Sequence, residues 1–414
     1  MPSSSSSNAL SQQPGLATRG IHQDAPLSGP EVAPSISTAT TFRHPTPEQI
    51  AAAPPGTFGD KWDPSSPSRD IYSRYTQPTL TRAETVLSSI IGRPTVVYPS
   101  GIAAFWAALL HVSPQVVAFT PGEGYHGCHT SLEVYRKVRG EDQVRIIHLD
   151  DEYPTDQKVL VWLETPLNPT GESRSIEAYA KKAHAAGAVL AVDSTFAPPP
   201  LQDPFKWGAD IVMHSGTKYF GGHSDALIGT LSVKSKEDWL QLWHTRTYTG
   251  SNIGSLDAWL LLRSLRTLSV RVTRQASTAT ALAQWLAALS RSDAGADLDG
   301  PGGVVEHVWH TSLQGNAREL VGEGKQMSSG PACFAILLKD PVYATHLPHK
   351  LKFFVPATSL GGAESLIEQR LVSDPGADPR LVRISVGLED FDDLKGDLIE
   401  GFKAVQRLGQ GAKL

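Results

Sequence analysis

The sequence predicts an α/β fold in which a mostly parallel sheet carries helices on both faces, followed by a smaller C-terminal α/β domain. From about residue 80 onward, short apolar runs alternate with segments of helical periodicity, and this alternation is typical of a parallel sheet. After Asp257 the pattern changes to leucine-rich helical sequence with few strands, which predicts the second domain. A chain of 414 residues with 40% hydrophobic content can form a core in each part.

The expected strands of the large domain are short apolar runs bounded by turn residues. They are Thr95–Tyr98, Val116–Thr120, Arg145–Leu149, Val159–Leu163, Ala188–Asp193 and Ile211–His214, with Cys333–Leu338 and Arg383–Val386 in the second domain. Helical spacing predicts helices over Ile102–His111 and Ser175–Ala186, the second starting at a Ser175 cap and ending before Gly187. The leucine-rich run Asp257–Leu268 predicts a long helix.

These patterns divide the chain into an N-terminal arm (1–65), a large domain (66–256) and a C-terminal domain (257–414). Residues 1–35 are rich in Ser, Gln, Pro and Gly and contain few large apolar side chains. Such a composition buries too little surface to offset the entropy of ordering, so we expect a loose, partly disordered arm. A second Pro/Gly/Ser-rich stretch runs from Pro54 to Ser68.

Composition and charge exclude several classes of partner. A net charge of -5 without a basic stripe argues against nucleic acid and against anionic membranes. No stretch approaches the roughly 20 apolar residues that span a bilayer, and the N-terminus lacks the pattern of a secretory signal. Two cysteines, Cys128 and Cys333, form no disulfide framework, which fits a reducing compartment.

The chain ends in Ala412-Lys413-Leu414, which resembles the Ser-Lys-Leu class of peroxisomal address. We therefore expect a cytoplasmic location, or a peroxisomal one through this tripeptide. A chance basic tail is the alternative explanation.

The sharpest signal for chemistry is a lysine directly after a predicted buried strand, in His214-Ser215-Gly216-Thr217-Lys218-Tyr219. A lysine acts as a Schiff-base nucleophile only when it is partly neutral, and desolvation near a cationic group favours the neutral form. Ser215 and Thr217 would offer hydroxyls to a phosphate, and neighbouring glycines would allow close backbone approach. Taken alone, the pattern also fits a surface lysine in a polar turn.

Two further motifs follow predicted strands. Asp193 ends one strand, and a carboxylate there could keep a pyridine nitrogen protonated, as pyridoxal 5'-phosphate (PLP) requires to act as an electron sink. Ser100-Gly101-Ile102 lies between a strand and a helix, where backbone N–H groups favour phosphate. Each motif alone also fits an ordinary cap or loop. Because the carboxyl ends of parallel strands gather at one edge, the three together predict PLP bound as a Schiff base on Lys218.

A resemblance to a known family rests on these motifs together with three further segments: Tyr72-Ser73-Arg74, the run Glu164–Gly171 and the block Ser359–Leu366. The sequence resembles the Cys/Met-metabolism (trans-sulfuration) family of fold-type I PLP enzymes over residues 30–405. That family includes cystathionine γ-synthase, the cystathionine lyases, methionine γ-lyase and homoserine-ester sulfhydrylases. The resemblance implies a fold similar to aspartate aminotransferase, a small amino-acid substrate and a homotetramer built from two active dimers.

The resemblance also implies roles for single residues. Lys218 would hold PLP and later move protons, and Asp193 would pair with the ring nitrogen. The other residues implied to bind the cofactor are Thr195 and Asn168 at the ring or its 3'-oxygen, Gly101, Ile102, Ser215 and Thr217 at the phosphate, and Tyr72 and Arg74 at the phosphate of the neighbouring subunit.

Four residues are implied to act on the substrate. Tyr125 would stack on the cofactor ring and exchange a proton with the leaving group, although a buried core tyrosine is the alternative. Arg383 would bind the α-carboxylate with help from Ser359, and Thr358 would line the substrate site.

The positions at which this sequence departs from the family pattern affect the assignment of the substrate and leave the cofactor assignment unchanged. The position before Ser359 is often a glutamate in members that handle cystathionine, whereas Thr358 supplies no charge. The usual Tyr-Gly-Gly becomes Tyr125-His126-Gly127-Cys128-His129, and Asn-Pro-Thr becomes Gln77-Pro78-Thr79. The Met-Thr-His run that the family has after the Glu364-Ser365-Leu366 block is replaced here by the segment Gln369–Arg380.

Thr358 favours γ-replacement, or γ-elimination, on an activated homoserine such as an O-acylhomoserine, as in cystathionine γ-synthase. The alternatives are a cystathionine β- or γ-lyase and, from another class, a catalytically decayed PLP-binding protein with a structural or regulatory role. The intact set of Lys218, Asp193, Arg383 and Tyr125 argues against decay. We expect no metal site, because the His126–His129 segment has no second cluster of ligands.

Overall fold

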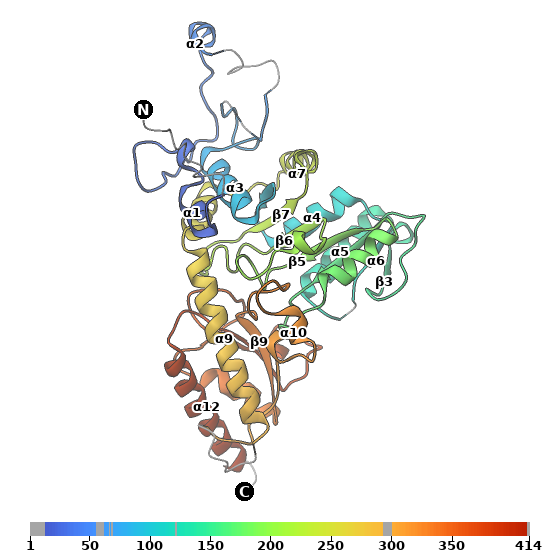
Figure 1. The fold of residues 1–414 in the computed structure, drawn as a ribbon, viewed down its shortest axis with the longest axis vertical. Helices are drawn as coiled ribbons and strands as arrows, with labels where there is room; N and C mark the ends of the chain where they lie inside the picture. Colours follow the sequence, from blue (N-terminus) through green and yellow to red (C-terminus); the bar gives the residue numbers. More distant parts are fainter. Residues whose placement is uncertain are drawn as a thin grey trace, which may run out of the picture.

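The structure, a computed structural model, describes residues 13–54, 62–65, 67, 69–120, 122–292 and 300–411. Figure 1 shows two sheets, one above the other, with the long helix α9 (Leu268–Ser290) running beside the lower one. The C-terminal tripeptide lies outside the described residues.

The larger sheet has seven strands in the order β1-β7-β6-β5-β4-β2-β3. Its strands are β1 Thr95–Tyr98, β2 Val116–Ala118, β3 Arg145–Ile147, β4 Val159–Glu164, β5 Val189–Asp193, β6 Ile211–His214 and β7 Gly229–Val233. Strands β2 to β6 are parallel to one another, while β7 is antiparallel to both neighbours. The mostly parallel sheet is confirmed. Strand β7 was not expected, because its sequence alternates small polar and apolar residues instead of forming an apolar run.

Helices cover both faces of this sheet, as the α/β prediction requires. The helices that follow its strands or flank it are α3 Pro78–Ile91, α4 Gly101–Val112, α5 His126–Arg139, α6 Ile176–Ala185 and α7 Lys236–Thr249. Alternate residues of β4 face opposite sides: Leu160 and Trp162 pack in the core with Phe105 of α4, while Val161 packs with Ile176 of α6. Strand β4, in the interior of the sheet, is therefore buried on both faces.

The smaller sheet has five strands in the order β10-β11-β12-β9-β8. They are β8 Val305–Trp309, β9 Cys333–Leu338, β10 Val355–Pro356, β11 Leu366–Gln369 and β12 Leu381–Ser385. The accompanying helices are α9, α10 Ala317–Leu320, α11 Pro341–His346 and α12 Phe391–Gly411. Short 3-10 turns lie at Ala25–Leu27, Glu141–Gln143, Pro204–Trp207, Thr311–Leu313, Leu347–His349 and Arg370–Val372.

The single helix predicted over Asp257–Leu268 is wrong in its end point. Helix α8 (Ser255–Leu265) ends before α9 begins at Leu268, and Arg266 and Thr267 separate the two. Buried Arg271 explains the break, since its guanidinium donates to the carbonyl of Ser264 at 3.0 Å and to the hydroxyl of Thr267 at 3.1 Å. The carbonyl at the end of α8 is thereby satisfied by a side chain of the next helix.

The described part of the N-terminal arm is more ordered than its composition predicts. Helix α1 (Leu16–His22) contacts α3, and α2 spans Pro47–Ala52. Asp24 is buried and forms an ion pair with buried Arg82 of α3 at 2.6 Å. A loose arm over residues 16–27 is therefore wrong, because one long-range ion pair and the packing of α1 fix this segment to the large sheet's helices.

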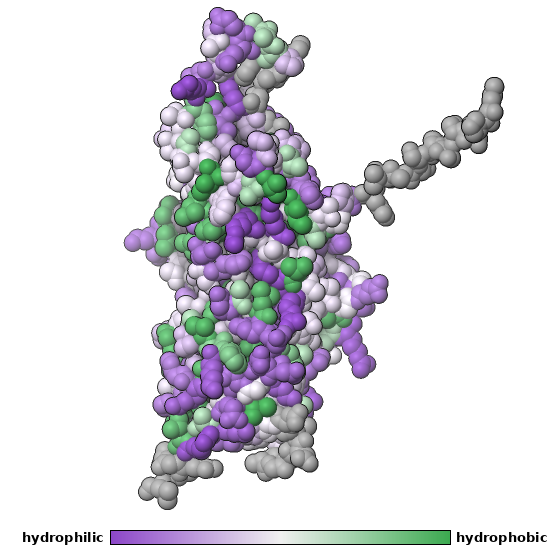
Figure 2. All heavy atoms as spheres, turned by 90° about the vertical axis from the view of Figure 1, so that its left-hand side faces the viewer, coloured by the Kyte–Doolittle hydropathy of each residue, from purple (hydrophilic) through white to green (hydrophobic). Residues whose placement is uncertain are grey.

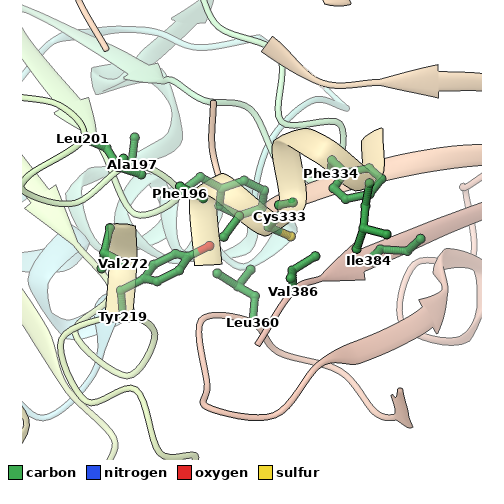
Figure 3. Packing of buried hydrophobic residues seen from close by; sticks show 14 of the residues in the cluster. Phe196, Ala197, Leu201, Tyr219, Val272, Cys333, Phe334, Leu360, Ile384 and Val386 are labelled. Atoms are coloured by element: carbon green, nitrogen blue, oxygen red, sulfur yellow. The ribbon is translucent and has the colours of Figure 1, made fainter. Parts of the chain in front are cut away.

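A buried hydrophobic cluster joins the two sheets beneath the strand ends (Figure 3). Phe196 and Tyr219 come from loops of the large sheet, while Cys333 and Phe334 lie on β9. Leu360 lies in a loop of the smaller domain beside Tyr219 and is buried in the same cluster. This packing fixes the loop after β6 against the loop before β11.

No described helix is long and apolar enough to cross a membrane. On the face shown in Figure 2, hydrophobic side chains are interspersed with hydrophilic ones.

Candidate active site

Two carboxylates lie side by side at the carboxyl ends of adjacent parallel strands. Glu164 ends β4, Asp193 ends β5, and the strand register places the two residues directly opposite each other. Asp193 accepts hydrogen bonds from the backbone N–H of Thr195 at 2.9 Å and from its hydroxyl at 2.5 Å. Glu164 accepts from the backbone N–H groups of Tyr125 and Asn168, each at 2.8 Å.

Burial raises the pKa of both carboxyl groups, and the charge of Asp193 raises that of Glu164 further. Two neighbouring like charges shielded from solvent disfavour simultaneous ionisation. A cationic group placed against this pair would relieve the repulsion, so the strand ends form a site for a positive charge.

Lys218 follows β6 and approaches the same edge of the sheet. Its Nζ donates to the hydroxyl of Ser359 at 2.7 Å. Burial, and then the nearby guanidinium of Arg383, lower the pKa of Lys218 to about 8. About half of this amine is therefore neutral near pH 8, and a neutral amine is what a nucleophile requires.

The loop that carries Ser359 presses closely on the lysine. Gly361 has φ +76°, and a Cβ there would lie 2.9 Å from the backbone nitrogen of Tyr219. Ser359 itself has φ +95°. Only a residue without a Cβ allows the loop of the smaller domain to approach Lys218 and Tyr219 this closely.

The start of α4 forms a cradle next to β6. The Ser100 hydroxyl caps the helix by accepting from the N–H of Ala103 at 3.1 Å, and the N–H groups of Gly101 and Ile102 lie in the first turn, where a helix offers no internal partner. A Cβ on Gly101 would lie 3.1 Å from the hydroxyl of Ser215. The helix N-terminus and this hydroxyl therefore face one small space, which suits an anion such as phosphate.

Thr217 lines the same region but is less free to bind phosphate. Its hydroxyl accepts from the backbone N–H of Ile228 at 2.8 Å and donates to the Ile228 carbonyl at 3.2 Å. The hydroxyl would have to leave that carbonyl to donate to a phosphate oxygen.

Arg383 occupies the opposite side, on β12. Its guanidinium donates to the side-chain oxygen of Asn168 at 3.0 Å and to the carbonyl of Ser359 at 3.2 Å. It also pairs with the buried carboxylate of Glu368 at 2.9 Å. The pair with Glu368 positions a cationic fork that suits a substrate carboxylate.

Tyr125 lies at the N-terminus of α5 and is half-exposed, and burial raises the pKa of its phenol. The His and Cys residues after it diverge. Cys128 is buried in the core, and the His129 ring bonds to the carbonyl of Glu123 at 2.7 Å. Among the described residues no group of three or more metal-binding side chains occurs.

Most of the predicted residues converge on one cavity of about 440 Å³ between the two sheets. The predicted residues that line it are Gly101, Ile102, Tyr125, Asn168, Asp193, Thr195, Ser215, Thr217, Lys218, Thr358, Ser359 and Arg383. The cavity is also lined by residues to which the sequence assigned no role, among them Glu164, Arg370 and Ser373. The end of an apolar strand could have indicated Glu164, whereas Arg370 and Ser373 lie in an irregular segment without a pattern.

Tyr72 and Arg74 do not line this cavity. The Arg74 guanidinium lies over the rings of Tyr72, at 5.7 Å, and Tyr75, at 5.0 Å, and Tyr72 is exposed. Their role toward the phosphate of a neighbouring subunit stays a prediction.

The cavity fits PLP on three independent observations. A buried lysine with a lowered pKa suits the aldehyde, paired buried carboxylates suit the ring nitrogen, and a helix N-terminus with a serine hydroxyl suits the phosphate. When bound, PLP supplies an electron sink for bonds at the substrate's α-carbon.

Comparison with known proteins agrees with this geometry. Residues 17–403 match the family described as Cys/Met metabolism PLP-dependent enzyme. The chain belongs to this family. It is therefore a PLP-dependent enzyme of sulfur amino-acid metabolism, with a small amino acid as substrate.

Its relatives include both cystathionine and methionine lyases. Cystathionine γ-lyase of Saccharomyces cerevisiae is 31% identical, with 95% of this chain and 98% of that protein covered. L-methionine γ-lyase of Pseudomonas putida is 30% identical, with 94% and 98% covered.

Solved structures confirm a fold-type I architecture. The methionine γ-lyase CalE6 from Micromonospora echinospora has a TM-score of 0.76 and 29% identity, with 94% of this chain and 99% of that chain covered. The metB structure from Corynebacterium glutamicum has a TM-score of 0.77 and 26% identity, with 95% and 98% covered.

Proposed function

We propose that this enzyme catalyses γ-replacement, or γ-elimination, on an activated homoserine such as an O-acylhomoserine, in the manner of cystathionine γ-synthase. The observation that carries the proposal is the side of the cavity around Thr358. That position presents a hydroxyl, and the carboxylate of Glu368, next to the cavity-lining Arg370 and Arg383, is held by these two arginines. Among the described residues on this side of the cavity, a substrate with a distal ammonium group, such as cystathionine, would find no free carboxylate.

The residues of the chain divide the chemistry between the two ends of the substrate. Arg383 binds the α-carboxylate, and Asn168 and Ser359 hold its guanidinium in place. Lys218, with its lowered pKa, removes the α-proton at Nζ and can deliver a proton to a neighbouring carbon. Tyr125, half-exposed at the cavity mouth, donates or accepts the proton of the γ-substituent.

A second candidate is a cystathionine β- or γ-lyase. The curated relatives support it, because cystathionine γ-lyase, cystathionine β-lyase and L-methionine γ-lyase are all about equally similar to this chain. The intact lysine, carboxylate and arginine set supports either reaction and opposes a decayed PLP-binding protein.

We propose also that the active assembly is a homotetramer of two dimers, with Tyr72 and Arg74 of one subunit reaching the phosphate of the next. Their absence from the cavity of their own chain supports this arrangement. The location we propose is the cytoplasm, or the peroxisome if Ala412-Lys413-Leu414 acts as an address.

The test is product analysis by mass spectrometry with purified holoenzyme and O-acetyl-L-homoserine, with and without cysteine. A cysteine-dependent adduct, or 2-oxobutyrate in its absence, is the expected result. A matched Thr358→Glu variant should gain activity on cystathionine, because its carboxylate can pair with the distal ammonium. Turnover of cystathionine far faster than of the ester by the wild type would overturn the proposal in favour of a lyase.

A further inference from the structure

Arg370 is a second buried arginine in the wall of the active-site cavity. It lies in the 3-10 turn Arg370–Val372, directly after β11, and its side chain is 5% exposed. It lines the cavity together with Thr358 and Ser373. A buried guanidinium is costly unless its donors are satisfied.

The described residues satisfy only part of the donors of Arg370. Its Nη1 donates to the Glu368 carboxylate at 2.7 Å, and this is its one side-chain hydrogen bond among the described residues. Its Nε is buried without any partner in the described structure, and so is the hydroxyl of nearby Ser373. Unpaired buried donors in a cavity wall indicate a missing acceptor.

Positive charge also exceeds negative charge on this wall, which again favours an anionic ligand. One oxygen of Glu368 accepts from both Arg383 and Arg370, at 2.9 and 2.7 Å. One carboxylate thus faces two guanidinium groups. Arg383 is additionally held by Asn168 and Ser359 toward the position of the α-carboxylate, whereas Arg370 has neither contact. The two arginines therefore present separate donor sets to the cavity.

We propose that Arg370, with the hydroxyls of Ser373 and Thr358, forms a second anion subsite that binds a further carboxylate of the amino-acid substrate. This inference rests on the proposed function for the placement of the α-carboxylate at Arg383. The substrate class it selects is an amino acid whose side chain or activating group ends in a carboxylate, such as a dicarboxylic acyl ester of homoserine. A guanidinium fork suits that group better than an ester or an alkyl chain.

The experiment measures binding without turnover, so that its outcome does not depend on γ-chemistry. Dissociation constants are measured from the absorbance change of the holoenzyme with L-glutamate and L-2-aminoadipate, each against its uncharged amide, L-glutamine and L-homoglutamine. The wild type should bind at least one acid about tenfold or more tightly than its amide, as expected for a charge-assisted contact. Arg370→Gln should reduce that ratio to near one while leaving the affinity for the amides within about threefold.

Two controls separate this role from a structural one. Arg380→Gln removes an arginine of the same segment that pairs with Asp378 and Glu306 and does not line the cavity, so the ratio should remain. Ser373→Ala should reduce the ratio partially. Absence of any acid-over-amide preference in the wild type would overturn the proposal. Equal weakening of acids and amides by Arg370→Gln would also overturn it, since Arg370 would then act only through Glu368 and Arg383.

Discussion

Replacing Lys218 by methionine should stabilise the apoprotein, and the gain should depend on pH. Burial and the neighbouring Arg383 lower the pKa of Lys218 from 10.5 to about 8 in the folded chain. The unfolded state therefore binds more protons than the folded state between these two values. Stability of the wild type consequently rises as pH increases from about 8 to about 10.5, and the full penalty is present below pH 8.

The magnitude follows from the size of the shift. Each pKa unit corresponds to about 1.4 kcal/mol, so a fall from 10.5 to about 8 costs the folded state about 3 kcal/mol at pH 7. Methionine keeps most of the length of the side chain and removes the charge. Lys218→Met should therefore be about 3 kcal/mol more stable than the wild type at pH 7, and this difference should approach zero above pH 10.5.

Urea unfolding of the two apoproteins from pH 7 to 11, at one fixed protein concentration, measures this difference. Lys181→Met, at an exposed position on α6, provides the matched control for removing a lysine. A difference between wild type and Lys218→Met that is constant across this pH range, or that grows with pH, would refute the reasoning. Such a result would mean that the lysine is not held in a desolvated site.

Four further results are expected. Asp193→Asn should weaken PLP binding at least about tenfold by equilibrium dialysis, because the ring nitrogen loses its anionic partner; an unchanged dissociation constant would contradict this role. Arg383→Gln should raise KM for the amino acid about tenfold to a hundredfold, from a contact of about 1.5–3 kcal/mol, and an unchanged KM would assign the carboxylate to another residue. Asp24→Asn should destabilise the fold by about 3–5 kcal/mol in urea, because it leaves buried Arg82 unpaired, whereas Glu177→Gln, in an exposed pair with Lys181, should change stability by less than about 1 kcal/mol. Gly361→Ala should cost about 1–2 kcal/mol for its positive φ alone and lower the melting temperature, while Gly396→Ala, in a helix with open space around it, should be neutral or stabilising.

The residues at strand ends were predictable because periodicity and topology act together. An apolar strand ending in Asp193, and another ending just before the lysine loop, must bring their next residues to one edge of a parallel sheet. The cavity accordingly contains Asp193, Ser215 and Lys218. The local pattern was enough to predict these site residues because the carboxyl ends of neighbouring parallel strands lie next to each other in the sheet.

The rest of the site depends on contacts that no local pattern encodes. The pairing of Arg82 with Asp24 joins residues 58 positions apart, and it orders the arm together with the packing of α1 on α3. The placement of Arg370 depends on a 3-10 turn in a segment with no periodicity. Strand β7 is specified by close approach: a Cβ on Gly229 would collide with the carbonyl of Ser100, so the strand lies against the start of α4 only because that residue is a glycine. These features follow from tertiary packing and not from propensity.

The distribution of charge across the cavity explains how one amino acid is oriented. Glu164 and Asp193, on the large sheet, form an anionic side, and Arg383 and Arg370, at the smaller sheet, form a cationic side. Lys218 lies between them, bonded to Ser359 of the second side and following a strand of the first. A substrate carboxylate is attracted to the arginines and repelled by the carboxylate pair, so the α-carbon comes to rest near the lysine amine. Because the two sides belong to different sheets, the packing between the sheets sets the position of the substrate relative to Lys218, and with it the geometry of proton transfer.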